Sequence, residues 1–202
     1  MRQETRTIYT AQELKENLPE AFKKAHQDFC NNQTEILWDG ELIDSLKMIF
    51  EAANIRLRDY EIDGICGHSI VKFDMDENVR ELSGKRAFAW LENNLFFGLR
   101  IPFTPLLRKE SQRRKLAQYG SYYRAGMIKP CPFTGVCFDD DFIDALKQSI
   151  KEKETIGEAF SNLAYVAGRI RAAEDEYQQT EEYFLDHADA NGYEFDEYGR
   201  QI

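Results

Sequence analysis

The chain has 202 residues, of which 43% are hydrophobic and 13% aromatic, and its formal charge is −10. This hydrophobic content is enough to build a core, so the composition excludes an intrinsically disordered protein. The acidic balance argues against general binding to nucleic acid, whose phosphates repel it. The charge is also uneven, because residues 108–138 carry a net +6 and residues 139–202 a net −11.

The four cysteines are too few and too scattered for a secreted disulfide scaffold. The opening Met1-Arg2-Gln3-Glu4 has no apolar signal core, and no run of about 18 apolar residues occurs. We therefore expect a cytoplasmic protein with reduced thiols that does not enter a membrane.

The N-terminal third predicts short helices. Ile8-Tyr9 is a strand candidate, and Thr10 with Glu13 has the spacing of a capping box, which begins a helix. Pro19 suits the first turn of a second helix, because its missing N–H is not needed there. Apolar residues at helical spacing predict a third helix that ends at Asn54.

In the next segments the hydrophobic pattern changes from helical spacing to the alternation of strands. Residues 55–63 and 69–74 alternate in the way that is typical of strands, and a Gly-containing turn separates them. Two extended runs around a short turn predict an antiparallel hairpin. A helical pattern then covers 77–98, with Gly84 as the weak point at which it can break into two pieces.

Helical periodicity is poor over 108–137, where basic and aromatic residues are interleaved. We interpret this segment as an ordered excursion rather than a linker, because large aromatic side chains are costly to leave in water. Asp139, Asp140 and Asp141 then begin a helix, where carboxylates favour the positive end of the helix dipole.

The longest helical pattern runs from Thr155 to Asn191. Thr155 and Glu158 form a second capping box, apolar residues recur at steps of three and four, and Gly192 supplies the stop signal. At 1.5 Å per residue, the pattern predicts one rod of roughly 50 Å.

These patterns predict an α+β protein that is mainly helical, with a small antiparallel sheet and one long C-terminal helix. The sheet is expected to combine Ile8, 55–62, 69–74 and a C-terminal hairpin or strand. We expect one domain over 1–202, made of an α+β body (1–100), a basic, aromatic-rich excursion (101–138) and a helical spine with a terminal hairpin (139–202).

Carboxylates cluster along the predicted spine. Paired carboxylates can do acid–base work or hold Mg²⁺, but most of these fall on consecutive residues, which point to different sides of a helix. They form either a solvated helix face or a surface that mimics nucleic acid phosphates for a basic partner. The candidates for partner binding are Glu174, Asp175, Glu181, Glu182 and Asp186.

The basic excursion has two interpretations. Basic and aromatic side chains together can bind single-stranded nucleic acid by phosphate contact and stacking. Alternatively, they neutralise the acidic spine of the same chain or of a second copy, which makes a homo-oligomer conceivable. The residues that would contact nucleic acid are Arg108, Lys109, Arg113, Arg114, Lys115, Tyr122 and Arg124.

Cys131 and Cys137 are the best candidates for a chemical site. Their spacing is wider than usual for a pair of zinc thiolates. They are therefore weak candidates for metal ligands, and a metal site would need Cys66 or His68 as well. The other interpretation is two partly buried thiols in a turn. No phosphate-binding glycine motif or other catalytic signature occurs, so we expect neither an enzyme nor a cofactor.

Both ends of the chain carry recognisable stretches. Residues 8–14 are similar to a Tyr-x-Phe-Asp-Glu-Leu opening, with Ala11 and Gln12 in place of Phe-Asp, and residues 190–199 to an Asn-x-Tyr-Glu-Phe ending. Trp38 and the 62–73 hairpin fall in compatible places. In these stretches the chain resembles a family of uncharacterised phage and prophage proteins that are sometimes labelled antitoxins. The resemblance implies a phage context, and no reaction or catalytic residue.

The leading expectation is a phage-encoded, non-enzymatic acidic protein in the host cytoplasm. It would engage or inhibit a host protein complex with a basic surface, in an anti-defence or nucleic-acid-mimic role. The alternatives are a nucleic-acid-associated protein that acts through residues 108–129 and a Cys-based metalloprotein.

Overall fold

The computed structural model describes residues 7–33, 38–64, 68–96 and 131–202. It confirms the α+β class, because helices predominate in these residues and the strands form one antiparallel pair. The chain divides into two compact units, unit 1 over Met1–Leu37 and Arg171–Ile202 and unit 2 over Trp38–Ile170. The segmentation expected from the sequence placed its boundaries elsewhere, near residues 100 and 138.

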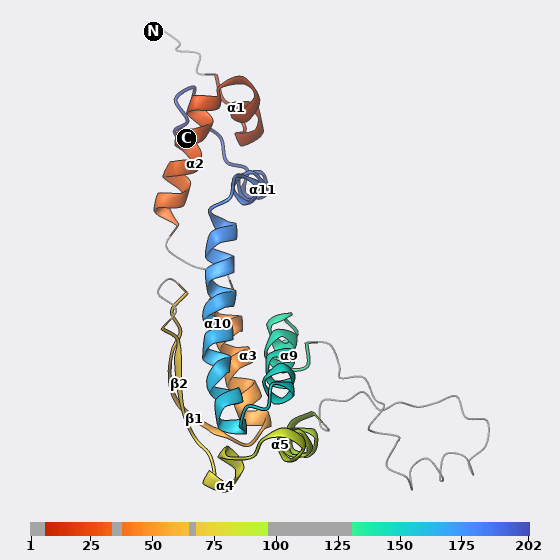
Figure 1. Cartoon of the computed structure of the whole chain (residues 1–202). Coiled ribbons are helices and arrows are strands. Elements are labelled where there is room, and N and C mark those ends of the chain that lie inside the picture. Colours follow the sequence, from red (N-terminus) through yellow and green to blue (C-terminus); the bar gives the residue numbers. More distant parts are fainter. Residues whose placement is uncertain (1–6, 34–37, 65–67, 97–130) are drawn as a thin grey trace, which may run out of the picture. The chain divides into compact units, whose positions relative to one another are not determined.

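Unit 1 contains α1 (Ala11–Asn17), α2 (Pro19–Asn32), the last turns of α10 (Ile156–Gln178) and α11 (Glu181–Asn191) (Figure 1). The predicted capping box begins α1. The Thr10 hydroxyl accepts from the Glu13 N–H at 3.2 Å, and the Glu13 carboxylate accepts from the Thr10 N–H at 2.8 Å. Pro19 is the first residue of α2, as its fixed φ favours.

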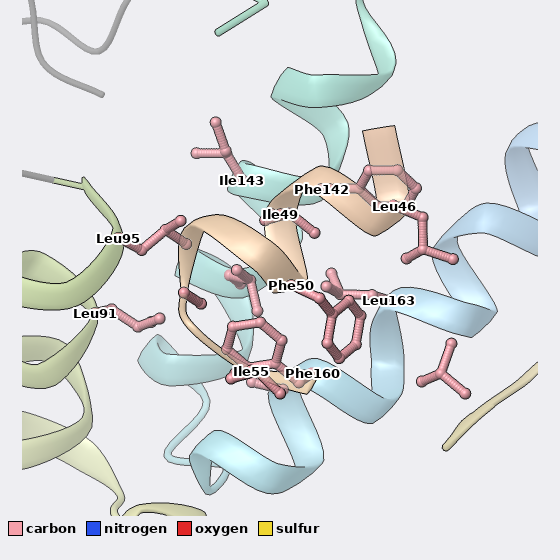
Figure 2. Close-up of a cluster of buried hydrophobic side chains, with 14 of the residues drawn as sticks. Leu46, Ile49, Phe50, Ile55, Leu91, Leu95, Phe142, Ile143, Phe160 and Leu163 are labelled. Carbon is pink, nitrogen blue, oxygen red and sulfur yellow. The ribbon is translucent and has the colours of Figure 1, made fainter. Parts of the chain in front are cut away.

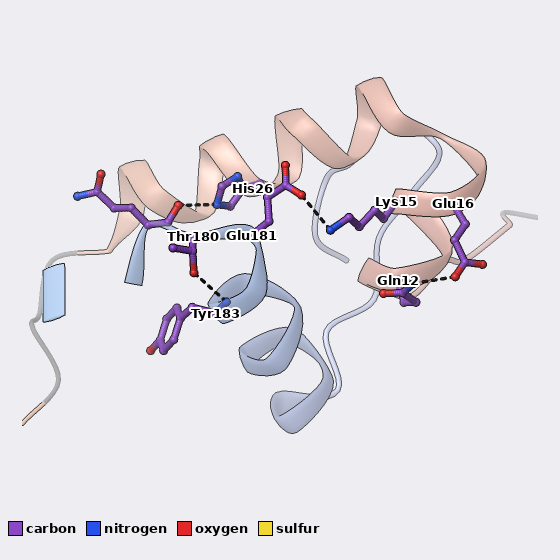
Figure 3. Close-up of polar contacts among 8 residues, drawn as sticks. Gln12, Lys15, Glu16, His26, Thr180, Glu181 and Tyr183 are labelled. Carbon is purple, nitrogen blue, oxygen red and sulfur yellow. Dashed lines mark hydrogen bonds and ion pairs between the residues drawn. The ribbon is translucent and has the colours of Figure 1, made fainter. Parts of the chain in front are cut away.

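The prediction of one helix from Thr155 to Asn191 is wrong, because the structure divides this stretch at Gln179 and Thr180. Thr180 is the N-cap of α11, and its hydroxyl oxygen accepts from the Tyr183 N–H at 3.2 Å (Figure 3). The same hydroxyl donates to the Tyr177 carbonyl at 2.7 Å, at the end of α10. One threonine therefore satisfies a backbone group on each side of the break.

The two chain ends meet within unit 1. Tyr9 and Phe195 exchange two backbone hydrogen bonds of 2.9 Å, and Phe195 also bridges Gln201 across a turn. These are isolated bridges, and they belong to a different unit from the paired strands. The predicted single sheet, which joined them to 55–62 and 69–74, is therefore wrong.

Gly199 ends the turn after Phe195, and we expect it to tolerate no side chain. It has φ +75°, and an added Cβ would lie 2.1 Å from the backbone oxygen of Ala21 on α2. Gly199→Ala should therefore lower the free energy of unfolding by about 2–4 kcal/mol. Gly192→Ala is the matched control, because φ there is +63° but nothing lies within 4 Å. Urea denaturation should show a loss of about 1 kcal/mol for this control, and equal losses would contradict the clash.

Unit 2 contains α3 (Asp39–Ala52), the strands β1 (Arg56–Glu61) and β2 (Ile70–Asp74), α9 (Phe138–Lys151) and the first part of α10. The predicted hairpin is confirmed, since β1 and β2 pair antiparallel with Leu57 opposite Phe73 and Tyr60 opposite Val71. A bulge between Leu57 and Asp59 shifts the register.

The helical pattern over 77–98 breaks where Gly84 predicted. It gives α4 (Glu77–Arg80), α5 (Gly84–Leu91) and a π-helical turn, η1 (Glu92–Phe96). This segment packs on α9, and α9 packs on α3.

The core of unit 2 forms where α3, α5, η1, α9 and α10 bring their apolar faces together (Figure 2). Phe50 and Phe160 meet edge to face, with ring centroids 5.2 Å apart, and both are fully buried. The apolar spacing of each helix is thus explained by one shared interior. The residues labelled there are Leu46, Ile49, Phe50, Ile55, Leu91, Leu95, Phe142, Ile143, Phe160 and Leu163.

Candidate functional site

An aromatic cluster holds α11 in place within unit 1. Phe184 is 1% exposed, and its ring lies 5.2 Å from Phe29 and 5.6 Å from Phe22 on α2, between centroids. The Phe195 ring also packs on Phe184, with ring centroids 6.0 Å apart. Because these rings fix the buried face of α11, they also fix which of its side chains point outward.

A cleft of about 430 Å³ is lined by the start of α1, by part of α11 and by the residues that follow α11. We call it the acidic groove. Its carboxylates are Asp186, Asp189 and Glu194, and all three residues are exposed. The complete lining is Thr10, Ala11, Gln12, Leu185, Asp186, Ala188, Asp189, Gly192, Tyr193 and Glu194.

The three carboxylates of the groove make no hydrogen bond or ion pair with any residue that the structure describes. Asp186 and Asp189 are three residues apart on α11, so they share one face of the helix. Glu194 reaches the groove after Gly192, which has a left-handed conformation and turns the chain at the end of α11. The groove is therefore negative and open to a ligand.

The predicted partner-binding residues on α11 have different surroundings. Asp186 lines the acidic groove, and Glu182 is exposed one helical turn before it. Glu181 instead forms an ion pair of 2.9 Å with Lys15 of α1 (Figure 3). The hydrogen bond and charge of Lys15 hold the pKa of Glu181 below its ordinary value. Glu181 thus joins two helices of unit 1.

The two predicted residues on α10, Glu174 and Asp175, do not line the groove, and both are half-buried. Asp175 accepts from the side-chain amide of Gln179 at 3.2 Å. Nearby, burial raises the pKa of the Tyr183 phenol, and the charge of Glu174 adds a smaller contribution. Of the five predicted carboxylates, Asp186 alone lines the acidic groove.

A second cleft of about 400 Å³ lies within unit 1, and Tyr193 lines both clefts. Aromatic rings and polar side chains line it together. The His187 ring packs between Phe29 and Tyr193, and its Nε2 lies 3.4 Å from the Tyr193 hydroxyl. The complete lining is Ala25, Asp28, Phe29, Asn32, Gln33, Phe184, His187, Tyr193, Phe195, Gly199, Arg200 and Gln201.

In unit 2, a single carboxylate organises the loop that contains the two predicted cysteines. Asp139 is completely buried, and its Oδ2 accepts from the N–H groups of Phe133 at 2.8 Å and Thr134 at 2.9 Å. Its Oδ1 accepts from the Thr134 hydroxyl at 3.1 Å. Three adjacent aspartates predicted only a favourable helix start, so this inward role is a structural finding.

Cys131 and Cys137 lie at the two ends of this loop, and Cys137 is the N-cap of α9. Within the described residues, no three His, Cys, Asp or Glu side chains are placed to hold a metal ion. Of the two further ligands that the sequence suggested, Cys66 lies outside the described residues and His68 lies among them. The basic candidates Arg108, Lys109, Arg113, Arg114, Lys115, Tyr122 and Arg124 lie outside them too.

Comparisons with models of known protein families, with curated proteins and with solved structures found no match. The resemblance to phage proteins and the absence of catalysis therefore stay predictions. None of the helices in the described part of the chain is long and apolar enough to cross a membrane.

Sequence reasoning missed most of the acidic groove. The shared face of Asp186 and Asp189 follows from their spacing, and helical periodicity could have singled them out. Thr10 and Glu194 come from opposite ends of the chain, and tertiary contacts such as the backbone pairing of Tyr9 with Phe195 bring those ends together.

Proposed function

We propose that the protein is a non-enzymatic binding protein whose acidic groove holds a positively charged segment of a partner protein. The observation that carries this proposal is that three carboxylates without partners among the described residues line one cleft of about 430 Å³. A solvated helix face would present such carboxylates on a convex surface, without a hollow beside them.

The lining of the groove suits an arginine or lysine side chain. Leu185, Ala188 and Tyr193 offer apolar surface to the methylene stem of such a side chain. Asp186 and Asp189 can then accept hydrogen bonds from the charged end, and a guanidinium can bind a carboxylate through two parallel bonds. The ligand class is therefore a cationic side chain on a flexible or protruding segment.

The charge around the groove favours the same ligand. Residues 7–33 and 171–202 carry 14 acidic and 5 basic side chains. This field accelerates the encounter with a cationic partner and repels nucleic acid phosphates. Binding should weaken with salt, since the Debye length falls from about 10 Å at 0.1 M to about 3 Å at 1 M.

The phage resemblance extends the proposal. In a phage context, the partner is a host protein with a basic surface, and occupation of that surface would inhibit the host complex. This part depends on the resemblance, whereas the cationic ligand class depends on the groove. The nucleic-acid alternative, through residues 108–129, stays a prediction.

A fluorescein-labelled peptide of six arginines tests the groove by fluorescence anisotropy. The double variant Asp186→Asn, Asp189→Asn should raise the Kd about tenfold, which corresponds to roughly 1.4 kcal/mol of lost binding free energy. The peptide should bind the unchanged protein at low salt and dissociate as salt is added. No binding at low salt would overturn the proposal.

The matched control is the double variant Glu174→Gln, Asp175→Asn, which removes the same charge from α10 outside the groove. It should change the Kd by less than about twofold, because neither side chain lines the groove that holds the peptide. Equal losses in both double variants would mean that net charge, and not the groove, attracts the peptide. Far-UV circular dichroism checks that both variants are folded.

A further inference from the structure

The loop between Cys131 and Cys137 has a fixed shape in the folded protein. Asp139 holds three of its backbone N–H groups, those of Phe133, Thr134 and Gly135. Thr134 is anchored in turn, because its hydroxyl lies 2.9 Å from the hydroxyl of the fully buried Ser45 on α3. The middle of the loop is therefore anchored by Asp139 and Ser45, two buried side chains.

Asp140 contacts both cysteine residues. Its Oδ1 accepts from the Cys131 N–H at 3.3 Å, and its Oδ2 lies 3.8 Å from the Cys131 Sγ. Asp140 belongs to the first turn of α9, and its own N–H donates to the Cys137 carbonyl at 3.0 Å. Cys131 and Cys137, the N-cap residue of α9, therefore both contact Asp140 in the first turn of that helix.

The two thiols differ in their surroundings. Cys137 is exposed, whereas Cys131 is half-buried. Burial, together with the negative charge of Asp140 and the nearby Cys137, raises the pKa of Cys131 to about 11. Cys131 therefore stays protonated at neutral pH, and it reacts slowly because the thiolate is the reactive form. An oxidant from solution should therefore meet Cys137 first.

We propose that Cys131 and Cys137 form a redox-active pair that closes to an intramolecular disulfide in exchange with a low-molecular-weight disulfide. In the first step, the Cys137 thiolate attacks one sulfur of the small disulfide, and a mixed disulfide forms while one small thiolate leaves. In the second step, the Cys131 sulfur attacks Cys137 and releases the second small thiolate, which takes up the Cys131 proton. Two protein thiols are oxidised, and one small disulfide is reduced to two thiols.

The test uses the full chain with Cys30→Ser and Cys66→Ser, so that only this pair of thiols is present. After equilibration with oxidised and reduced glutathione, the tryptic peptide over residues 125–147 should lose the mass of two hydrogen atoms. Neither cysteine should then be alkylated by iodoacetamide. A stable glutathione adduct on Cys137, or a disulfide-linked dimer on a non-reducing gel, would overturn the proposal.

Two further variants separate the chemistry from a merely structural effect. Cys131→Ser should trap the glutathione adduct on Cys137, because the second step has lost its nucleophile. Asp140→Asn should lower the pH at which Cys131 of the reduced pair becomes alkylated, since it removes a neighbouring negative charge. An unchanged pH profile of alkylation in Asp140→Asn would contradict the assigned arrangement of the pair.

Discussion

Replacing Phe184 by alanine is expected to lower the free energy of unfolding of unit 1 by about 3–5 kcal/mol. Phe184 is 1% exposed, and its ring contacts aromatic rings from α2 and from the segment that follows α11. Removal of the ring leaves a cavity that its neighbours cannot fill, because they are held by separate elements. The loss should exceed that of any exposed substitution in the same unit.

The measurement should follow unit 1 directly. Both tryptophans, Trp38 and Trp90, lie in unit 2, so their fluorescence does not report on this cluster. Hydrogen exchange of the α11 amides, read by mass spectrometry, gives the opening free energy of the helix. Ile202→Ala is the control, since this side chain is 59% exposed and should change the value by less than about 0.5 kcal/mol. A loss below about 1 kcal/mol in Phe184→Ala would contradict the central role of the ring.

The features that sequence reasoning predicted correctly are local ones. Both capping boxes are present, and the second joins the Thr155 N–H to the Glu158 carboxylate at 2.8 Å. A capping box depends on residues three positions apart, so its signal is complete within one helical turn. The same reason explains the correct positions of Pro19 and of the break at Gly84.

The break at Thr180 was missed because the apolar periodicity continues across it. Tyr177 and Phe184 are seven residues apart, which is the spacing of two helical turns, so the pattern alone predicts one helix. Thr180 did carry a signal, since threonine is a preferred N-cap and acidic residues follow it. The residue at the third helical position is Tyr183, however, so the capping-box pattern that marked the other two helix starts is absent here.

Sequence reasoning could not choose among neighbouring carboxylates. Asp139, Asp140 and Asp141 have the same chemistry, yet one is completely buried, one is half-buried beside Cys131, and one is exposed. The choice depends on the direction from which the 131–137 loop approaches α9, which is a tertiary property. The acidic groove was missed for the same reason, because its lining comes from both ends of the chain.

Removing the Asp139 side chain is the second change from which we expect a large effect. Asp139→Ala leaves the N–H groups of Phe133, Thr134 and Gly135 without the acceptor they share. Phe133 and Thr134 are half-buried, and a donor that loses its partner away from water costs free energy. Because three donors and the Thr134 hydroxyl are affected together, the free energy of unfolding should fall by about 3–5 kcal/mol.

Two substitutions on the same helix make this prediction specific. Asp139→Asn keeps the shape and one acceptor oxygen, but hydrogen bonds to a neutral acceptor are weaker. The loss in the free energy of unfolding should therefore be about half that of Asp139→Ala. Asp144→Ala removes an exposed carboxylate that pairs with Lys147, and it should cost less than about 0.5 kcal/mol. Urea denaturation followed by tryptophan fluorescence is the right measurement, because Trp90 packs on Phe160 in the core of unit 2. If Asp139→Ala and Asp144→Ala cost the same, the buried carboxylate does not organise the loop.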